Sequence, residues 1–152
     1  SLLQVKDHIY KVGSSLHRLG FRKGDTIAIY SPNHLHYATM LHAAAILGGT
    51  ITTINPAYTD TEVQHHIKDS GTSFVSFIKY LVLIPEISAK YFVTLPELLP
   101  RLVPLLRTLG IQKVIALTLE DIPVPSYDGY VVSYHHLLQT GNLNLSDPLS
   151  ID

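Results

Sequence analysis

The chain has 152 residues, of which 46% are hydrophobic and 15% charged, a balance typical of a globular domain with a real core. Its formal net charge of -1 leaves no basic excess for nucleic acid or an anionic membrane surface. The absence of cysteine excludes disulfides and thiolate metal sites. The most apolar stretch, from Phe74 to Ile87, is too short to span a bilayer and contains Lys79.

The first part of the chain predicts alternating helices and strands. Apolar residues three and four apart over Ser1–Leu19 indicate an amphipathic helix, which Gly20 ends. Short β-branched and aromatic runs predict strands at Thr26–Tyr30 and Thr50–Ile54. An alanine-rich helix from about Leu35 to Leu47 lies between these strands.

A third helix is predicted after the second strand. Thr59 stands three residues before Glu62, the spacing of a capping box, and the helix that it opens runs to about Asp69. Strands that alternate with helices imply a parallel sheet with right-handed crossovers. We therefore expect Thr26–Tyr30 and Thr50–Ile54 to be adjacent parallel strands.

The second part of the chain is less regular. A strand is predicted at Tyr91–Thr94 and another at Lys113–Leu117. Pro96 fits the first turn of a helix that runs to Leu109, and Pro100 and Pro104 inside it should kink or divide it.

Near the end, a loop that contains two prolines and a glycine precedes a last short helix. The loop includes Pro123 and Gly129, and Ser133 is the candidate cap of a helix that continues through Leu138. Residues 141–152 are polar, and we expect an extended tail there.

Asn55 and Tyr58 are the candidate site residues. They follow a strand of the predicted parallel sheet, and ligands bind at the carboxyl edge of such sheets. The alternative is that Asn55 and Pro56 only build the turn, and it is favoured. Asp25, just before a strand, is typical of a turn residue rather than of a catalyst.

The histidines, serines and glycines of the sequence do not indicate a metal, catalytic or phosphate-binding site. The nine histidines include two adjacent pairs, His65-His66 and His135-His136, whose side chains diverge by about 100° on a helix. No HExxH pattern, Ser-His-Asp order or GxSxG elbow occurs, so we expect surface or partly buried histidines rather than a metal site. The glycines at positions 13, 20 and 24 fit no phosphate loop, and we interpret them as turn glycines.

The stretch from Leu19 to Gly71 has four features in order. A Leu-Gly turn precedes Lys-Gly-Asp, and a strand then ends in a Pro-Asn turn. An alanine-rich helix closes on a glycine pair, and the segment TTINPAYTDTE follows. The features lie at Leu19, Gly20, Lys23, Gly24, Asp25, Pro32, Asn33, Ala43, Ala44, Gly48, Gly49 and Thr52–Glu62. In this combination the chain resembles the N-terminal domain of adenylate-forming (AMP-binding) enzymes. The NPxYT form is similar to the branch of acyl-CoA synthetases, coumarate–CoA ligases and luciferases.

The resemblance resumes at Ala89–Leu102 and Leu109–Leu117. Family sequences run from Asp-Ser-Gly directly into Ala-Lys-Tyr, whereas here Thr72–Ser88 lies between the two motifs. We interpret 72–88 as an insertion. An unspliced intron read in frame is the hypothesis, with an error in gene annotation or a lineage-specific insertion as alternatives. We expect Tyr91–Thr94, rather than Ser73–Phe77, to occupy the sheet.

The resemblance implies an α/β fold, a partial Rossmann-like parallel sheet flanked by helices. It implies an incomplete AMP-binding N-terminal domain at 1–140, followed by the tail at 141–152. It also implies a two-step parent reaction, in which a carboxylate and ATP give an acyl-adenylate and pyrophosphate, and CoA then displaces AMP. ATP, Mg²⁺ and CoA are the cofactors implied for the parent enzyme.

The family's phosphate loop, its acidic motif and its C-terminal catalytic lysine match no position here. We therefore expect a fragment of an ATP-dependent acyl-CoA synthetase that is inactive alone, with no catalytic, cofactor-binding or metal-binding residue. Two alternatives stay open: a non-enzymatic binding module derived from the fold, and an unrelated flavodoxin-like nucleotide-binding domain. For the latter, Ser31-Pro32-Asn33-His34 is a poor phosphate loop. The acyl substrate is open, and an intracellular compartment, cytoplasm or peroxisome, is expected.

Overall fold

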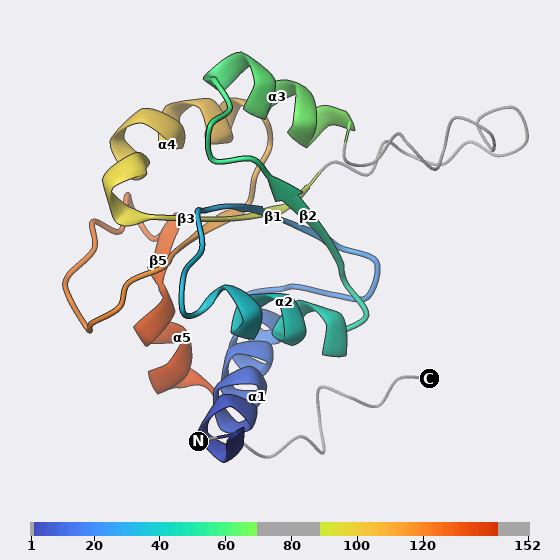
Figure 1. Ribbon diagram of the computed structural model, residues 1–152, viewed down its shortest axis with the longest axis vertical. Helices are drawn as coiled ribbons and strands as arrows, with labels where there is room; N and C mark the ends of the chain where they lie inside the picture. The colour runs from blue at the N-terminus through green and yellow to red at the C-terminus, as the bar shows by residue number, and fades with distance from the viewer. Residues whose placement is uncertain (1, 70–88, 143–152) are drawn as a thin grey trace, which may run out of the picture.

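The computed structural model describes residues 2–69 and 89–142 (Figure 1). Within them, five strands form one parallel sheet in the order β2-β1-β3-β4-β5, with helices on both faces. The strands are β1 (Thr26–Tyr30), β2 (Thr50–Ile54), β3 (Tyr91–Thr94), β4 (Lys113–Ala116) and β5 (Val131–Ser133). The predicted α/β fold is confirmed. The proposed insertion at 72–88 and most of the tail at 141–152 lie outside the described residues.

Strand pairing agrees with the sequence for four strands. β1 pairs in parallel with β2, from Thr26 opposite Thr50 to Tyr30 opposite Ile54, as predicted. β3 lies between β1 and β4, which confirms that Tyr91–Thr94 occupies the sheet. β5 was not predicted. It is three residues long and pairs only with β4, and so short a run has no detectable period.

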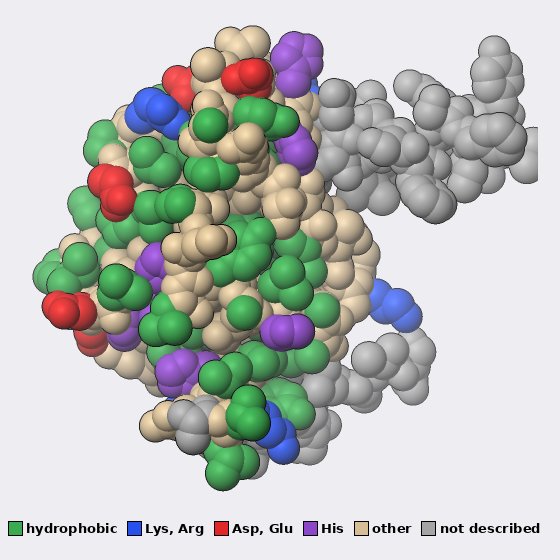
Figure 2. Space-filling view, in the orientation of Figure 1, with side chains coloured by type: hydrophobic (Ala, Val, Ile, Leu, Met, Phe, Trp, Pro, Cys, Tyr) green, Lys and Arg blue, Asp and Glu red, His purple; other side chains and the backbone are tan. Residues whose placement is uncertain are grey.

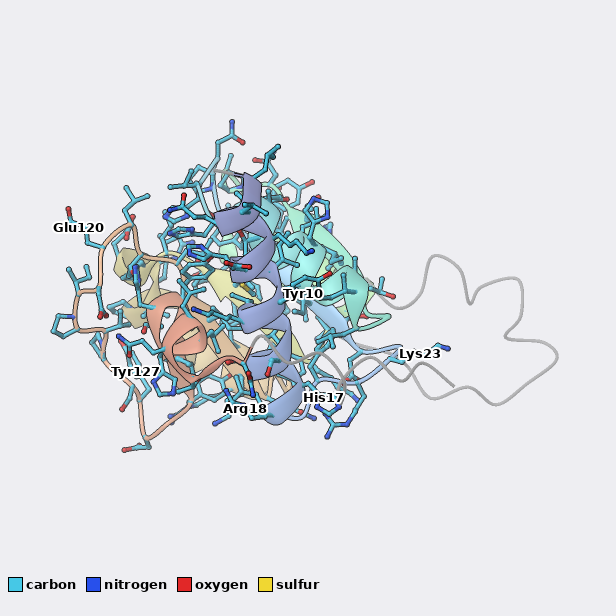
Figure 3. The ribbon with its side chains drawn as sticks, turned by 90° about the horizontal axis from the view of Figure 1, so that it is seen from below. Tyr10, His17, Arg18, Lys23, Glu120 and Tyr127 are labelled. Atoms are coloured by element: carbon cyan, nitrogen blue, oxygen red, sulfur yellow. The ribbon has the colours of Figure 1, made fainter. Side chains whose placement is uncertain are left out.

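The helices form two layers, one on each face of the sheet. One layer contains α1 (Leu2–Arg18), α2 (Tyr37–Ile46) and α5 (Tyr134–Thr140), and the other contains α3 (Asp60–Asp69), the 3-10 turn η1 (Pro96–Leu98) and α4 (Leu99–Thr108). Figure 3, which views the molecule from below, shows α1 at the centre of the picture, with α5 next to it. Among the described helices, none is both long and apolar enough to cross a membrane.

Alternating residues of the strands pack into two separate hydrophobic cores, one on each face of the sheet. Ile27 and Ile29 of β1 pack with α1, α2 and α5, whereas Ala28 and Tyr30 pack with α3 and α4. This is the period-two pattern of a strand covered on both faces. Each large apolar side chain buried in this way contributes about 1.5–3 kcal/mol.

Three helix ends refine the predictions. The capping box is confirmed, because the Thr59 N–H donates to the Glu62 carboxylate (2.7 Å) and the Glu62 N–H donates to Thr59 Oγ1 (3.4 Å). The second helix begins at Tyr37 rather than Leu35, since a bend at Pro32 and Asn33 and a turn at Leu35 and His36 occupy the residues after β1. The helix predicted from Pro96 is divided into η1 and α4, and Pro100 lies in the first turn of α4, where its missing N–H costs nothing.

The turn between α1 and β1 uses two glycines in the left-handed region. Gly20 has φ +102° and Gly24 has φ +86°, which supports their interpretation as turn glycines, whereas that interpretation is wrong for Gly13, which lies inside α1. Asp25 also serves the turn, because its Oδ2 accepts the Arg22 N–H at 2.9 Å. Its Oδ1 pairs with Lys90 Nζ at 2.5 Å, so this carboxylate joins the turn to the residue before β3.

Candidate functional site

The carboxyl edge of the sheet is where a site is expected. All five strands are parallel, so the loops that follow them lie at one edge. From the central pair β1 and β3, the chain crosses to β2 on one side and to β4 on the other. In open α/β sheets of this strand order, that point of divergence is the usual ligand position.

Asn55 and Tyr58 lie at this edge, and both take part in hydrogen bonds of the turn after β2. Asn55 Oδ1 accepts the Ala57 N–H at 3.0 Å, and the Tyr58 N–H donates to the Asn55 carbonyl at 3.0 Å. The hydroxyl of Tyr30 lies 3.0 Å from the carbonyl oxygens of both Pro56 and Tyr58. These contacts favour the alternative in which Asn55 builds the turn.

The same loop is connected to α4 through polar contacts. Arg101 donates to the Tyr30 hydroxyl at 3.1 Å, and its Nε lies 3.3 Å from Asp60 Oδ1. About half of each of the Arg101 and Asp60 side chains is exposed, so the ion pair contributes little to stability. Its effect is to fix the direction of the β2–α3 loop.

A second group at this edge was not foreseen as a unit. Three histidine rings gather around the end of β1: those of His34 and His36 are 5.4 Å apart, and those of His36 and His135 are 6.1 Å apart. The ring of His36 stacks on that of Tyr134 with centroids 3.9 Å apart and an angle of 14°. We call His8, His34, His36, Tyr134 and His135 the imidazole cluster.

Burial dominates the electrostatics of this cluster. Together with the neighbouring imidazoles of His34, His135 and His8, it lowers the pKa of His36 to about 4. Burial also lowers the pKa of His34, whereas Glu97 raises it. Burial raises the pKa of Tyr134, so its phenol stays neutral. The expectation of surface or partly buried histidines is therefore wrong for His36, which is 8% exposed.

The cluster does not fit a metal or a magnesium–nucleotide complex. Among the described residues, no group of three or more His, Cys, Asp or Glu side chains has the geometry to hold a metal ion. Mg²⁺ prefers carboxylate and phosphate oxygens, whereas the side chains here are imidazoles and a phenol. The loop after β1 contains no glycine, and the hydroxyl of Ser31 donates to the Pro32 carbonyl at 2.9 Å.

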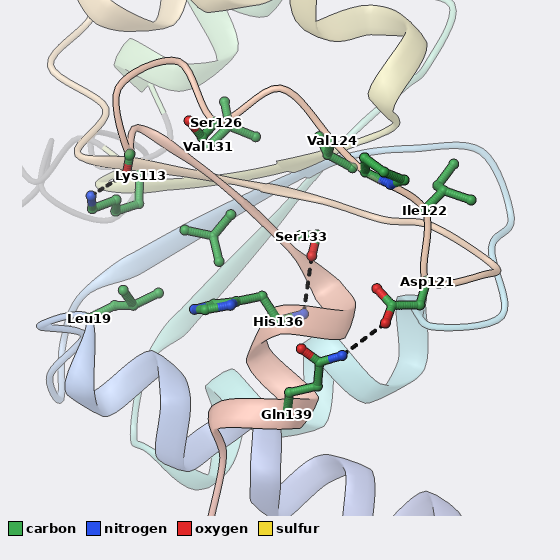
Figure 4. A pocket seen from close by; sticks show the side chains of 13 residues that line it. Leu19, Lys113, Asp121, Ile122, Val124, Ser126, Val131, Ser133, His136 and Gln139 are labelled. Carbon is green, nitrogen blue, oxygen red and sulfur yellow. Dashed lines mark hydrogen bonds between the residues drawn. The ribbon is translucent and has the colours of Figure 1, made fainter.

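A hollow of about 580 Å³ lies beside β5 and α5 (Figure 4). Ser, His and Asp side chains line it, but they do not form a relay. Ser133 Oγ accepts the backbone N–H of His136 at 3.1 Å, and Asp121 accepts from the amide of Gln139 at 2.8 Å. The serine thus caps α5, and the carboxylate fastens α5 to the loop after β4.

On the face drawn in Figure 2, the distribution of charged side chains indicates no further site. Acidic and basic side chains are scattered over it singly, among apolar side chains and histidines. A nucleic-acid surface would require basic side chains gathered on one face.

Comparison with known proteins identifies the family. The family model for AMP-binding enzymes matches residues 2–121. The chain is 35% identical over 78 residues to 4-coumarate–CoA ligase 4 of Arabidopsis thaliana, covering 51% of this chain and 14% of the relative. It is 27% identical over 136 residues to a probable 4-coumarate–CoA ligase 1 of Dictyostelium discoideum, covering 88% of this chain and 23% of the relative.

A solved structure agrees on the fold. The long-chain-fatty-acid–CoA ligase of Archaeoglobus fulgidus superimposes with a TM-score of 0.67 at 22% identity, over 93% of this chain and 23% of that one. The chain thus spans less than a quarter of the length of each of these three proteins. Since the family model covers most of its residues, the chain belongs to the AMP-binding enzyme family.

Proposed function

We propose that this chain supplies the N-terminal scaffold of an ATP-dependent acyl-CoA ligase and no catalytic group of its own. The parent reaction converts a carboxylate, ATP and CoA into acyl-CoA, AMP and pyrophosphate. The match of the family model over residues 2–121 is the observation on which the proposal rests. Similarity to coumarate–CoA and long-chain fatty-acid–CoA ligases supports a carboxylate substrate.

The contacts at the carboxyl edge support a scaffold role. Several polar groups described there are engaged in turns, caps and helix contacts: Asn55 in its own turn, Tyr30 with the β2–α3 loop, and Ser133 at the start of α5. The imidazole nitrogen of His36 that lacks a partner is buried behind the Tyr134 ring. Such groups position loops around a neighbouring site rather than act on a substrate.

The test is pyrophosphate release by the purified chain with ATP, Mg²⁺ and a panel of carboxylates. The panel should contain cinnamic acids and medium- and long-chain fatty acids, with a full-length coumarate–CoA ligase as positive control. We expect release by the control and none by this chain above the level without carboxylate. Carboxylate-dependent release by this chain would show that it contains a catalytic site. Tight ATP binding without release would favour the non-enzymatic binding module instead.

A further inference from the structure

The last described elements, β5 and α5, form a small unit at the edge of the sheet. β5 pairs only with β4, and α5 has seven residues, too few to persist as an isolated helix. The unit is therefore held by its contacts with the rest of the molecule. Ser15 of α1 donates to the Leu137 carbonyl at 2.7 Å, and Thr118 lies 2.9 Å from His135 Nδ1. The closest ring contact of the unit with the rest of the molecule is the stack of His36 on Tyr134, with centroids 3.9 Å apart.

The surroundings of this stack disfavour the protonated form of His36. His36 is 8% exposed, and its Nε2 has no hydrogen-bond partner among the described residues, so none of them accepts from an added proton. His36 is also the N-cap residue of α2, where the helix dipole disfavours a cation. The N–H of His36 donates to Nδ1 of His34 at 3.2 Å, and a protonated His34 has no lone pair at that nitrogen.

The groups around His36 offer no compensation for a positive charge. Those that act on its charge are three imidazoles: His8 from α1, His34 from its own loop and His135 from α5. Tyr134 of α5 is a buried, neutral phenol. The carboxylate of Glu97, in η1, acts on His34. Protonation of these imidazoles at acidic pH therefore places several positive charges close together.

We propose that the imidazole cluster is an acid-sensitive latch, which holds β5 and α5 on the sheet when its imidazoles are neutral and releases them when they are protonated. Release separates α5 from α1 and uncovers the apolar side chains of Tyr134 and Leu137, both fully or almost fully buried in the closed form. The sheet from β2 to β4 stays folded.

The direction of the pH dependence follows from proton linkage. His36 takes up a proton with a pKa of about 4 in the closed form and near the ordinary value of about 6.5 once it is freed. The closed form is thus fully favoured above about pH 6.5 and loses its advantage as the pH falls toward 4. From pH 7 to pH 5 the ratio of closed to open forms should fall roughly 20-fold through His36 alone.

Hydrogen exchange of the full chain, followed by mass spectrometry and corrected for intrinsic rates, tests the latch. Peptides that cover 131–140 should lose protection roughly 20-fold between pH 7 and pH 5, while peptides from β1 keep theirs. In His36→Gln the level of protection is lower, but this pH dependence is lost. His42→Gln is the matched control, because His42 is exposed on the same helix, and it should behave as the wild type.

Two outcomes would overturn the proposal. One is equal pH dependence in the wild type and His36→Gln, and the other is simultaneous loss of protection in β1 and α5. If His36→Gln does not fold, direct titration of the His36 ring by NMR in the wild type replaces it. A pKa well below 6.5, with α5 resonances changing in step, supports the latch. An ordinary pKa contradicts it.

Discussion

Alanine at position 49 would test how tightly the turn between α2 and β2 packs on the aromatic core. A Cβ at Gly49 would lie 2.5 Å from Cε1 of Phe21, closer still to Cζ of that ring, and 3.1 Å from the carbonyl oxygen of Asp25. Phe21 is fully buried and meets Tyr91 of β3 edge-on, with ring centroids 5.1 Å apart. The ring therefore cannot move away without disturbing the central strand.

Overpacking of this kind costs about 1–3 kcal/mol, so Gly49→Ala should lower the free energy of unfolding by that amount. Replacing Phe21 by leucine removes the clashing ring atoms. In the Phe21→Leu background, Gly49→Ala should therefore cost at least about 1 kcal/mol less than in the wild type. Urea unfolding followed by circular dichroism gives the four free energies.

Gly13→Ala is the control for this cycle. There the nearest atom to an added Cβ is the flexible Cδ1 of Ile46, at 3.1 Å, so we expect a smaller loss than at Gly49. Wild-type stability of Gly49→Ala, or the same cost in both backgrounds, would refute the packing described around Phe21.

Three further predictions concern caps and the segment 72–88. Ser133→Ala removes the acceptor of the His136 N–H and should lower stability by about 1 kcal/mol, measured by thermal unfolding, with Ser126→Ala as a control outside the caps; an unchanged midpoint contradicts the cap. Hydrogen bonds from Thr59 lower the pKa of Glu62, so Thr59→Ala should raise that pKa toward its ordinary value, which carboxyl NMR titration would show; no change contradicts the capping box. Deletion of 72–88 should leave the circular dichroism spectrum intact, because all five described strands lie outside it, and unfolding of the shortened chain would show that the segment is native.

Much of the fold could be predicted because local patterns agree with the packing. The β-branched runs of β1 and β2 and the apolar run of β3 are strands in the structure, and the capping box at Thr59 opens α3. Element ends were less predictable, since the loop after β1 contains a turn at Leu35 and His36 that no propensity separates from a first helical turn. β5 escaped prediction because a three-residue strand is defined by its pairing with β4 and not by its own sequence.

The candidate site was only partly predictable, for a related reason. Asn55 could be assigned to a turn from its Asn-Pro context, and the structure agrees. His36 was expected, like the other histidines, to be at the surface or partly buried, because its burial depends on Tyr134, which lies far along the chain and reaches it only through the sheet. Four histidines from three distant segments form a cluster that spacing along the chain does not reveal.

The central claim is that these residues are a scaffold without a nucleotide site, and calorimetric titration of the chain with ATP and Mg²⁺ tests it most directly. We predict no saturable binding in the micromolar range, because the described carboxyl edge presents no phosphate loop and the side chains of Ser31 and Asn55 are engaged in local hydrogen bonds. Saturable micromolar binding that is weakened by substitution of Asn55 or His36, but not by substitution of His42, would contradict the account.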